Sequence, residues 1–209
     1  MIHTTDFIAT FGVKTKWKHL MAEQKVYVPT VGEEVANATL AAVAASVFVI
    51  SLLLMFLGST LYHSMHPASR HKEVFHILDH IFIYVAIAGT YTPIALSVIG
   101  GWQGTFITGL QWAMVLFGII YKSLARRSIP AISLTIYLVM GWTIVFFMPL
   151  FVRHASMPLL VLIAAGGVLY TAGAWVYARK GFRYHHMVWH LLINLAAICH
   201  FTAIVFYLY

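Results

Sequence analysis

Six long apolar segments dominate the chain, and short stretches that carry charged residues, proline or glycine separate them. The segments cover residues 35–62, 74–98, 106–121, 132–150, 159–178 and 187–209. A transmembrane helix needs about 20 mostly apolar residues to cross about 30 Å of hydrocarbon, and most of the segments reach or approach that length. They are apolar on all sides, whereas a helix of a soluble protein is apolar along one stripe. The pattern predicts an all-α fold, a polytopic transmembrane helical bundle with six evident spans.

The start of the chain differs from the rest. Residues 1–30 are polar and mixed, and they carry Lys14, Lys16, Lys18 and Lys25. We therefore predict two parts, a polar basic N-terminal tail over residues 1–30 and the transmembrane helical bundle over residues 31–209.

The connectors between the apolar segments differ in charge. Those after the first, third and fifth segments hold eight basic residues, namely Arg70, Lys72, Lys122, Arg126, Arg127, Arg179, Lys180 and Arg183. The other connectors hold one, Arg153. Because cytoplasmic loops carry an excess of Lys and Arg, we predict a multi-pass protein of the cell membrane with the eight basic residues in the cytoplasm. The C-terminal Tyr209 then lies outside.

This orientation conflicts with the N-terminal tail. Six spans and an outside C-terminus require an outside N-terminus, yet the four lysines of the tail favour the cytoplasm. A seventh span would remove the conflict. Residues 35–62 number only 28, which is enough for one tilted helix and too short for two. The sequence therefore predicts six spans, of which the first disagrees with the charge pattern.

The composition places the chain among membrane proteins. It is 61% hydrophobic and 9% charged, whereas a soluble domain carries about 25% charged residues. The net charge of +7 comes from basic residues that lie almost entirely between apolar segments. They are therefore interpreted as topology determinants and headgroup contacts. We expect membrane lipids as partners and no nucleic acid. The single cysteine, Cys199, excludes an intrachain disulfide and a Cys-rich metal site.

Polar side chains inside the spans are the candidates for function, because they are costly in lipid. Asp79 lies in the first turns of the second span and is the last acidic residue of the chain. His63 ends the first span, and His186 and His190 begin the sixth. The predicted orientation brings all four to the cytoplasmic end of the bundle.

The spacing of these residues suits a metal ion. His186 and His190 are four residues apart and share one helix face, so both can point at one ion. A third imidazole from His63 would leave the fourth position of a tetrahedral zinc ion open, as in catalytic zinc sites. Ser59 lies one turn before His63, close enough to hydrogen-bond a ligand or substrate. Asp79 would orient a ligand imidazole or accept a proton from metal-bound water.

Other roles account for most of the twelve histidines. Those in tails or connectors suit an interfacial role: His3, His19, His71 and His154. Those near the predicted site are alternatives to its ligands: His66, His76, His80 and His185. His76 and His80 form a second pair four residues apart. His200 lies in the middle of a span, where a hydrogen bond to a neighbouring helix would explain it.

Six short motifs follow one another along the chain. They are STLYH at 59–63, LDH at 78–80, IAGTYTP at 87–93, YLVMGW at 137–142, HMVWH at 186–190 and CHF at 199–201. Together they resemble the bacterial hemolysin III family, the prokaryotic branch of the progestin and adipoQ receptor superfamily, over about residues 33–209. The resemblance implies a seven-helix bundle with zinc bound near the cytoplasmic face by His63, His186 and His190. It also implies that Asp79 and Ser59 lie beside the metal-bound water.

The chain departs from the family pattern at its front. Glu33, Glu34 and Asn37 resemble the acidic-Asn motif of the family's first helix, but only 21 residues separate Asn37 from Ser59. The family needs most of two helices in this interval. The histidine that usually follows the motif is also absent, and Ala41 stands in that region. We therefore expect the first span to be shortened or fused with the second, with the metal motifs unaffected.

Several functions are compatible with these features. The superfamily includes alkaline ceramidases, which implies a zinc-dependent intramembrane hydrolase of a lipid amide or ester bond. A second hypothesis is a non-catalytic receptor or membrane-homeostasis regulator with structural zinc. A third, membrane permeabilisation, has less support, because the sequence shows neither an amphipathic strand pattern nor a charged pore-lining helix. Histidine pairs from two helices would also suit haem, which predicts visible absorbance.

Overall fold

The computed structural model describes residues 29–124 and 129–208, and these residues are almost entirely helical, with no strand among them. The chain divides into two units, residues 1–38 and 39–209. The predicted tail over residues 1–30 lies almost wholly outside the described part of the chain. In the first unit, Thr30 and Glu33 form a capping box at the start of a helix: the Thr30 N–H donates to Glu33 Oε2 at 2.7 Å, and the Glu33 N–H donates to Thr30 Oγ1 at 3.3 Å.

The helices follow the predicted segments closely. They are α2 (Val31–Ser64), α3 (Lys72–Pro93), the π-helical η1 (Ile94–Ile99), α4 (Gly101–Leu124), α5 (Pro130–Trp142), the 3-10 helix η2 (Thr143–Phe147), α6 (Met148–His154), α7 (Met157–Arg179) and α8 (His185–Tyr207). Taken as continuous spans, they give six helices that are long and apolar enough to cross a membrane within the described residues. The predicted all-α bundle with six evident spans is confirmed. The first apolar segment forms one helix of 34 residues, and the implied seventh helix stays a prediction.

Residue chemistry explains several helix boundaries. Pro130, Pro149 and Pro158 occupy the first turns of α5, α6 and α7, where the missing N–H costs nothing. Gly100, with φ +65°, separates η1 from α4. Lys180 adopts a left-handed conformation with φ +46° after the last residue of α7. These local signals place the connectors where the apolar segments end.

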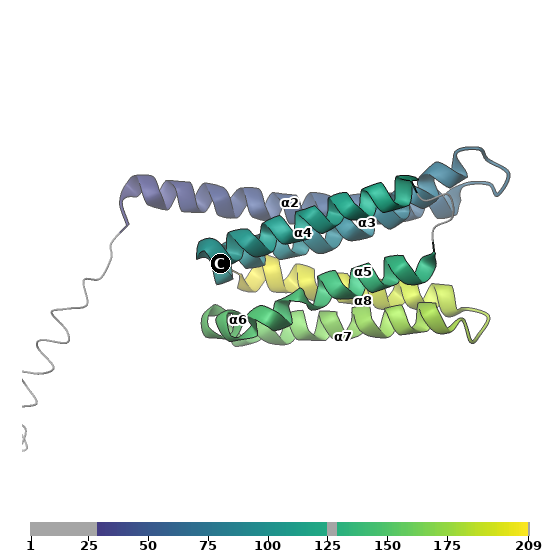
Figure 1. Cartoon of the computed structure of the whole chain (residues 1–209). Helices are drawn as coiled ribbons and strands as arrows, with labels where there is room; N and C mark the ends of the chain where they lie inside the picture. Colours follow the sequence, from purple (N-terminus) through teal and green to yellow (C-terminus); the bar gives the residue numbers. More distant parts are fainter. Residues whose placement is uncertain (1–28, 125–128, 209) are drawn as a thin grey trace, which may run out of the picture. The chain divides into compact units, whose positions relative to one another are not determined.

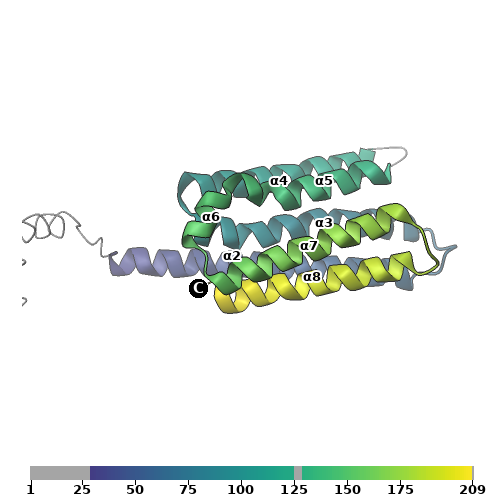
Figure 2. The same ribbon diagram turned by 90° about the horizontal axis from the view of Figure 1, so that it is seen from below.

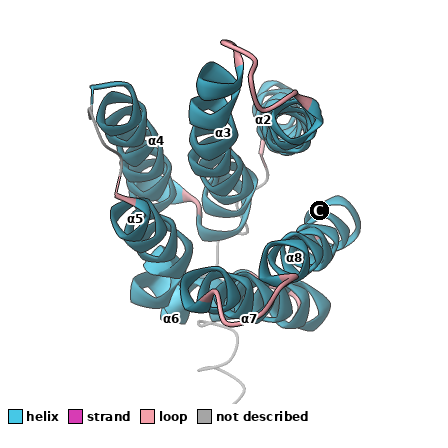
Figure 3. Cartoon of the chain, turned by 90° about the vertical axis from the view of Figure 1, so that its right-hand side faces the viewer, coloured by secondary structure: helices cyan, strands magenta, loops and turns pink. Residues whose placement is uncertain are grey.

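Within residues 39–209, neighbouring helices run in opposite directions along a common axis (Figure 1). The most extensive contact joins α7 to α8, which lie side by side in Figures 1 and 2, and the next joins α3 to α4. Viewed along the axis, α3, α4, α5, α7 and α8 are arranged in a ring (Figure 3). The α2–α3 and α7–α8 connectors lie at the same end of this unit.

Glycine permits close contact between α2 and α3. A methyl group added at Gly89 would collide with the Ser51 side chain, and one added at Gly58 would collide with the Phe82 ring. Side chains from both helices therefore fit against backbone, a common way to pack helices in membranes. This contact fixes the height of the last turn of α2 against the first turns of α3.

The fourth span is broken, which the continuous apolar segment 132–150 did not predict. The α-helix ends at Trp142, residues 143–147 form a 3-10 helix, and a new helix begins at Met148 with Pro149 in its first turn. The Tyr91 hydroxyl donates to the Gly141 carbonyl oxygen at 2.7 Å and accepts from the Ile144 N–H at 2.9 Å. The Gln111 amide donates to the Met140 carbonyl oxygen at 3.0 Å. The Tyr91 side chain thus bridges backbone groups on the two sides of the break, and Gln111 is a second donor to a carbonyl oxygen that also accepts from the Thr143 N–H.

Candidate metal centre

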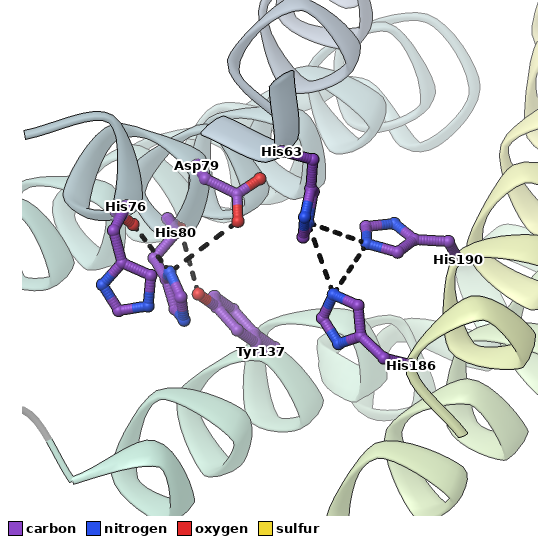
Figure 4. A network of polar contacts seen from close by, with 7 residues as sticks. All are labelled: His63, His76, Asp79, His80, Tyr137, His186 and His190. Carbon is purple, nitrogen blue, oxygen red and sulfur yellow. Dashed lines mark hydrogen bonds and ion pairs between the residues drawn. The ribbon is translucent and has the colours of Figure 1, made fainter. Parts of the chain in front are cut away.

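Three histidines from two helices converge at one end of the bundle. His63 lies in the last turn of α2, and His186 and His190 lie in the first turns of α8. The Nε2 atom of His63 is 3.3 Å from that of His186 and 3.2 Å from that of His190, and the latter two are 3.1 Å apart (Figure 4). They form the one group of three ligating side chains, among the described residues, that could hold a metal ion.

Hydrogen bonding alone does not account for this triangle. Each Nε2 presents either an N–H or a lone pair in the plane of its ring. Among three nitrogens at least two must therefore present the same kind of group to each other. At most two of the three contacts can be hydrogen bonds at one time, and the third is repulsive. A cation bound by three lone pairs would stabilise all three positions at once.

Aromatic side chains surround the histidine triangle. The Trp189 ring centroid is 4.4 Å from that of His190 and 5.1 Å from that of His186. The Tyr62 ring lies 4.7 Å from His63. These contacts limit the rotation of the imidazoles. Sequence reasoning did not select Trp189, although its place inside the HMVWH motif was the available signal.

The two other predicted site residues lie beside the triangle. Asp79 on α3 is buried, with 5% of its surface exposed. Ser59 lies one turn before His63 on α2, and its side chain adjoins the Asp79 carboxyl group. In Figure 4, Asp79 lies between the triangle and His80, whose Nδ1 is 3.9 Å from Asp79 Oδ2. The fold thus brings all five predicted residues to one end of the bundle, and their chemical roles stay predictions.

The alternative histidines do not join the three-histidine group. His80 Nδ1 donates to the His76 carbonyl oxygen at 2.8 Å, and the Tyr137 hydroxyl donates to the His80 carbonyl oxygen at 3.0 Å. His185 Nδ1 donates to the Phe182 carbonyl oxygen at 2.9 Å. Because a carbonyl oxygen only accepts, these Nδ1 atoms carry hydrogen and are not free as metal ligands. The Nε2 atoms of His80 and His185 lie outside the three-histidine group.

Lys122 is a residue that the sequence placed wrongly. It was assigned to a connector as a topology determinant, but it lies inside α4 and only 4% of its surface is exposed. Its ammonium group interacts electrostatically with Asp79, and also with His76 and His80. A buried basic group therefore acts electrostatically on residues beside the histidine triangle. Its position directly after an apolar segment gave no indication that it was buried.

A cavity of about 710 Å³ lies inside the bundle next to His186 and His190 of the histidine triangle. His186, His190, Asp79 and Ser59 line one end of it, and Phe151 lines the other. Side chains of α2, α3, α5, α6, α7 and α8 contribute to a wall that is mostly apolar. The volume lies in the range of small-molecule sites. A long apolar ligand with one polar end would match this distribution.

Comparison with known proteins gives a consistent result. The family described as haemolysin-III related matches residues 8–201. The hemolysin-3 homolog of Bacillus subtilis (strain 168) is 34% identical over 165 residues, 79% of this chain and 77% of the relative. Hemolysin-3 of Bacillus cereus is 35% identical over 167 residues, 80% and 76% of the two chains.

A human relative is more distant. The monocyte to macrophage differentiation factor of Homo sapiens is 29% identical over 175 residues, 80% of this chain and 71% of the relative. No solved structure matches the chain.

Proposed function

The chain belongs to the haemolysin-III related family of membrane proteins, and from this premise we propose that it is a zinc-dependent intramembrane hydrolase of a lipid amide or ester bond. One observation carries the proposal. Three imidazole nitrogens converge beside a mostly apolar cavity, and two of the three histidines, His186 and His190, line it. A lipid would place its chain along the wall and its carbonyl group near His63, His186 and His190.

The dimensions of the triangle fit zinc. In a tetrahedral site with Zn–N distances of 2.0–2.1 Å, two ligand nitrogens lie about 3.3–3.4 Å apart. The three Nε2 separations are 3.1–3.3 Å. The three nitrogens are therefore spaced nearly as the ligands of one tetrahedral zinc ion would be, which supports the proposal. Borderline-soft imidazole ligands also favour zinc over magnesium or calcium, which prefer oxygen.

Zinc held by three histidines supplies a Lewis acid that polarises a carbonyl group and lowers the pKa of a coordinated water to about 7. The residues of the chain would do the rest. Asp79 would accept a proton at its carboxylate and pass it to the leaving group. Ser59 would hold the Asp79 carboxylate in place by its hydroxyl. Trp189 and Tyr62 would keep the imidazoles in position.

We also propose that the histidine triangle faces the cytoplasm. Among the described residues, Arg70, Lys72, Arg179, Lys180 and Arg183 lie in or next to the connectors at this end, whereas Arg153 lies at the end of α6. The asymmetry supports a cytoplasmic position under the positive-inside rule. The cell membrane is the expected location, with the C-terminus outside.

The alternative of a receptor with structural zinc has less support. Structural zinc is almost always held by four protein ligands in a closed site. Only three ligating side chains meet here among the described residues, and they border a cavity that a ligand would enter. Three histidines beside a lipid-sized cavity would leave room for a substrate at the ion, which favours chemistry over a purely structural role.

The test combines metal content with lipid turnover by the purified full-length protein. Zinc-loaded protein should release fatty acid from an N-acyl sphingoid amide or a matched acyl ester. Asp79→Asn should retain zinc and lower turnover by about 10²–10⁴-fold, the contribution of a general base. Stoichiometric zinc without turnover of any amide or ester would establish the structural-zinc alternative instead. Full turnover by Asp79→Asn would contradict the role given to Asp79.

A further inference from the structure

Lys180 occupies a backbone position that favours glycine. It directly follows α7, with φ +46° and ψ +30°, and among the described residues it is the one residue other than glycine with a positive φ. The left-handed region is unfavourable for a residue that carries a Cβ atom, and many helices place glycine at this position. Gly181 is the next residue and does not adopt a positive φ. Such a conformation at a residue with a long side chain points to a function for that side chain.

Lys180 also lies on the wall of the cavity, at the end of the bundle that carries the histidine triangle (Figure 1). It lines the cavity together with His185 and His186, which begin α8. It is the one lysine or arginine among the described residues that line the cavity, and it is exposed to solvent. A residue that lines the cavity and is also exposed lies where the cavity meets the surface. We call this place, lined by Lys180 and His185, the cavity mouth.

The other basic side chains of this connector already have partners. The Arg179 guanidinium lies over the Trp175 ring at 5.0 Å from its centroid, and that of Arg183 lies over the Tyr184 ring at 5.5 Å. Neither arginine lines the cavity. Lys180 forms no ion pair with a described residue. The described side chains therefore leave the one positive charge at the cavity mouth uncompensated.

We propose that Lys180 binds the phosphate of a lipid headgroup at the cavity mouth, so that the substrate class is a phosphate-bearing lipid. This inference rests on the proposed function, because it requires a lipid chain in the cavity. A lipid with its chain along the apolar wall and its carbonyl group at the histidine triangle has its headgroup towards the connector. Lysine binds phosphate as a point charge. The charge at the mouth therefore favours an anionic headgroup over a neutral one.

A general role in membrane topology or in contact with the bilayer makes a different prediction. Arg179 is adjacent in sequence and exposed at the same end of the bundle. Replacement of either residue by glutamine removes one positive charge from the same connector. Contact with an anionic bilayer would therefore change alike in the two variants. Recognition at the cavity mouth depends on Lys180 alone.

The experiment measures how well two lipids displace a labelled long-chain alcohol from the purified full-length protein in neutral detergent. The probes are 1-O-octadecylglycerol 3-phosphate and 1-O-octadecylglycerol, which differ only in the phosphate. Their ether bond resists an amide or ester hydrolase, so that binding is measured apart from turnover. We expect the phosphate to tighten binding about fivefold to tenfold, the effect of one charged contact that is partly exposed to solvent. High salt should weaken this preference.

Four variants separate recognition from surface charge and from folding. Lys180→Gln should bind the two ethers equally, and Lys180→Arg should keep the preference for the phosphate. Arg179→Gln is the matched control and should also keep it. Lys180→Gly should lose the preference, yet it should unfold at a temperature no lower than the unaltered protein, because glycine adopts the left-handed conformation without strain.

Two further measurements identify what holds the phosphate. A metal ion at the histidine triangle is a second group that can bind it. In that case the preference would survive Lys180→Gln and disappear in His190→Ala, which would overturn the inference. Inorganic phosphate at about 1 mM should leave the preference unchanged, because without a lipid chain its affinity is low. Loss of the preference at that concentration would assign the mouth to a free anion instead.

Three other results would contradict the inference. Equal binding of the two ethers by the unaltered protein would exclude a phosphate site at the mouth, and it would leave the proposed hydrolase unaffected. An equal loss of preference in Lys180→Gln and Arg179→Gln would assign it to surface charge. A lower unfolding temperature in Lys180→Gly would give the lysine side chain a structural role. Absence of zinc-dependent turnover, measured separately on amide and ester lipids, would reject the proposed function whichever ether binds more tightly.

Discussion

At the scale of single residues, the stability of the histidine triangle depends on whether a metal ion is bound. Three imidazoles at 3.1–3.3 Å cannot all hydrogen-bond to one another. A bound metal ion links α2 to α8 through three bonds and therefore stabilises the folded state. Removal of one ligand should reduce both the affinity for metal and this stabilisation.

His190→Ala tests this prediction directly. The variant should lose bound metal. A chelator should lower the unfolding temperature of the unaltered protein, and it should leave the unfolding temperature of the variant unchanged. His185→Ala is the matched control, because His185 lies at the start of the same helix and its Nδ1 bonds only to the Phe182 carbonyl oxygen among the described contacts. Equal metal loss in the two variants would show that the triangle is not the binding site.

At the scale of helices, glycine positions the elements that carry the site. Gly166 holds the His200 ring against α7, whereas the neighbouring Gly167 has no atom within 4 Å of an added methyl group among the described residues. The two glycines are consecutive in the sequence, but only Gly166 contacts a side chain of another helix. They therefore form a matched pair for measuring how closely α7 and α8 must pack.

Gly166→Ala should destabilise the protein by about 1–3 kcal/mol, the usual cost of overpacking a filled contact. Gly167→Ala should change stability by less than about 0.5 kcal/mol. Unfolding in mixed micelles, followed by circular dichroism, would measure both values. Similar effects of the two substitutions would show that α7 and α8 do not pack as closely as described here.

The break in the fourth span depends on Tyr91. Tyr91→Phe removes the hydroxyl that bridges the Gly141 carbonyl oxygen and the Ile144 N–H. Two backbone groups would lose their partner in the bundle, at a cost of about 1–3 kcal/mol. Tyr207→Phe is a suitable control, because Tyr207 is exposed at the end of α8. An unchanged unfolding temperature in Tyr91→Phe would mean that the hydroxyl does not support the break.

The limits of sequence-based prediction follow from these elements. Span length is set by the bilayer, so the apolar segments alone predicted the six helices. The break at residues 143–147 could not be predicted, because its stabilising groups come from Tyr91 and Gln111 on other helices. His186 and His190 were recognisable from their spacing. The burial of Lys122 depends on packing between helices, which hydropathy does not determine.

At the scale of the whole molecule, orientation in the membrane can be tested with single cysteines. Ala68→Cys lies in the α2–α3 connector at the end that carries the histidine triangle, and Ser156→Cys lies between α6 and α7. Both positions are exposed. On intact cells, an impermeant thiol reagent should label Ser156→Cys and not Ala68→Cys. The unaltered chain, whose single cysteine is Cys199, gives the background level of labelling. The reverse labelling would place the site outside the cell.

The account as a whole depends on a metal ion bound by three histidines beside the cavity. X-ray absorption at the zinc edge, on the full-length protein loaded with one equivalent of zinc, tests this most directly. We predict three imidazole nitrogens and one oxygen ligand at about 2.0–2.1 Å, and a reduced imidazole signal in His186→Ala. A spectrum with sulfur ligands, with four protein nitrogens, or unchanged in His186→Ala would contradict the account.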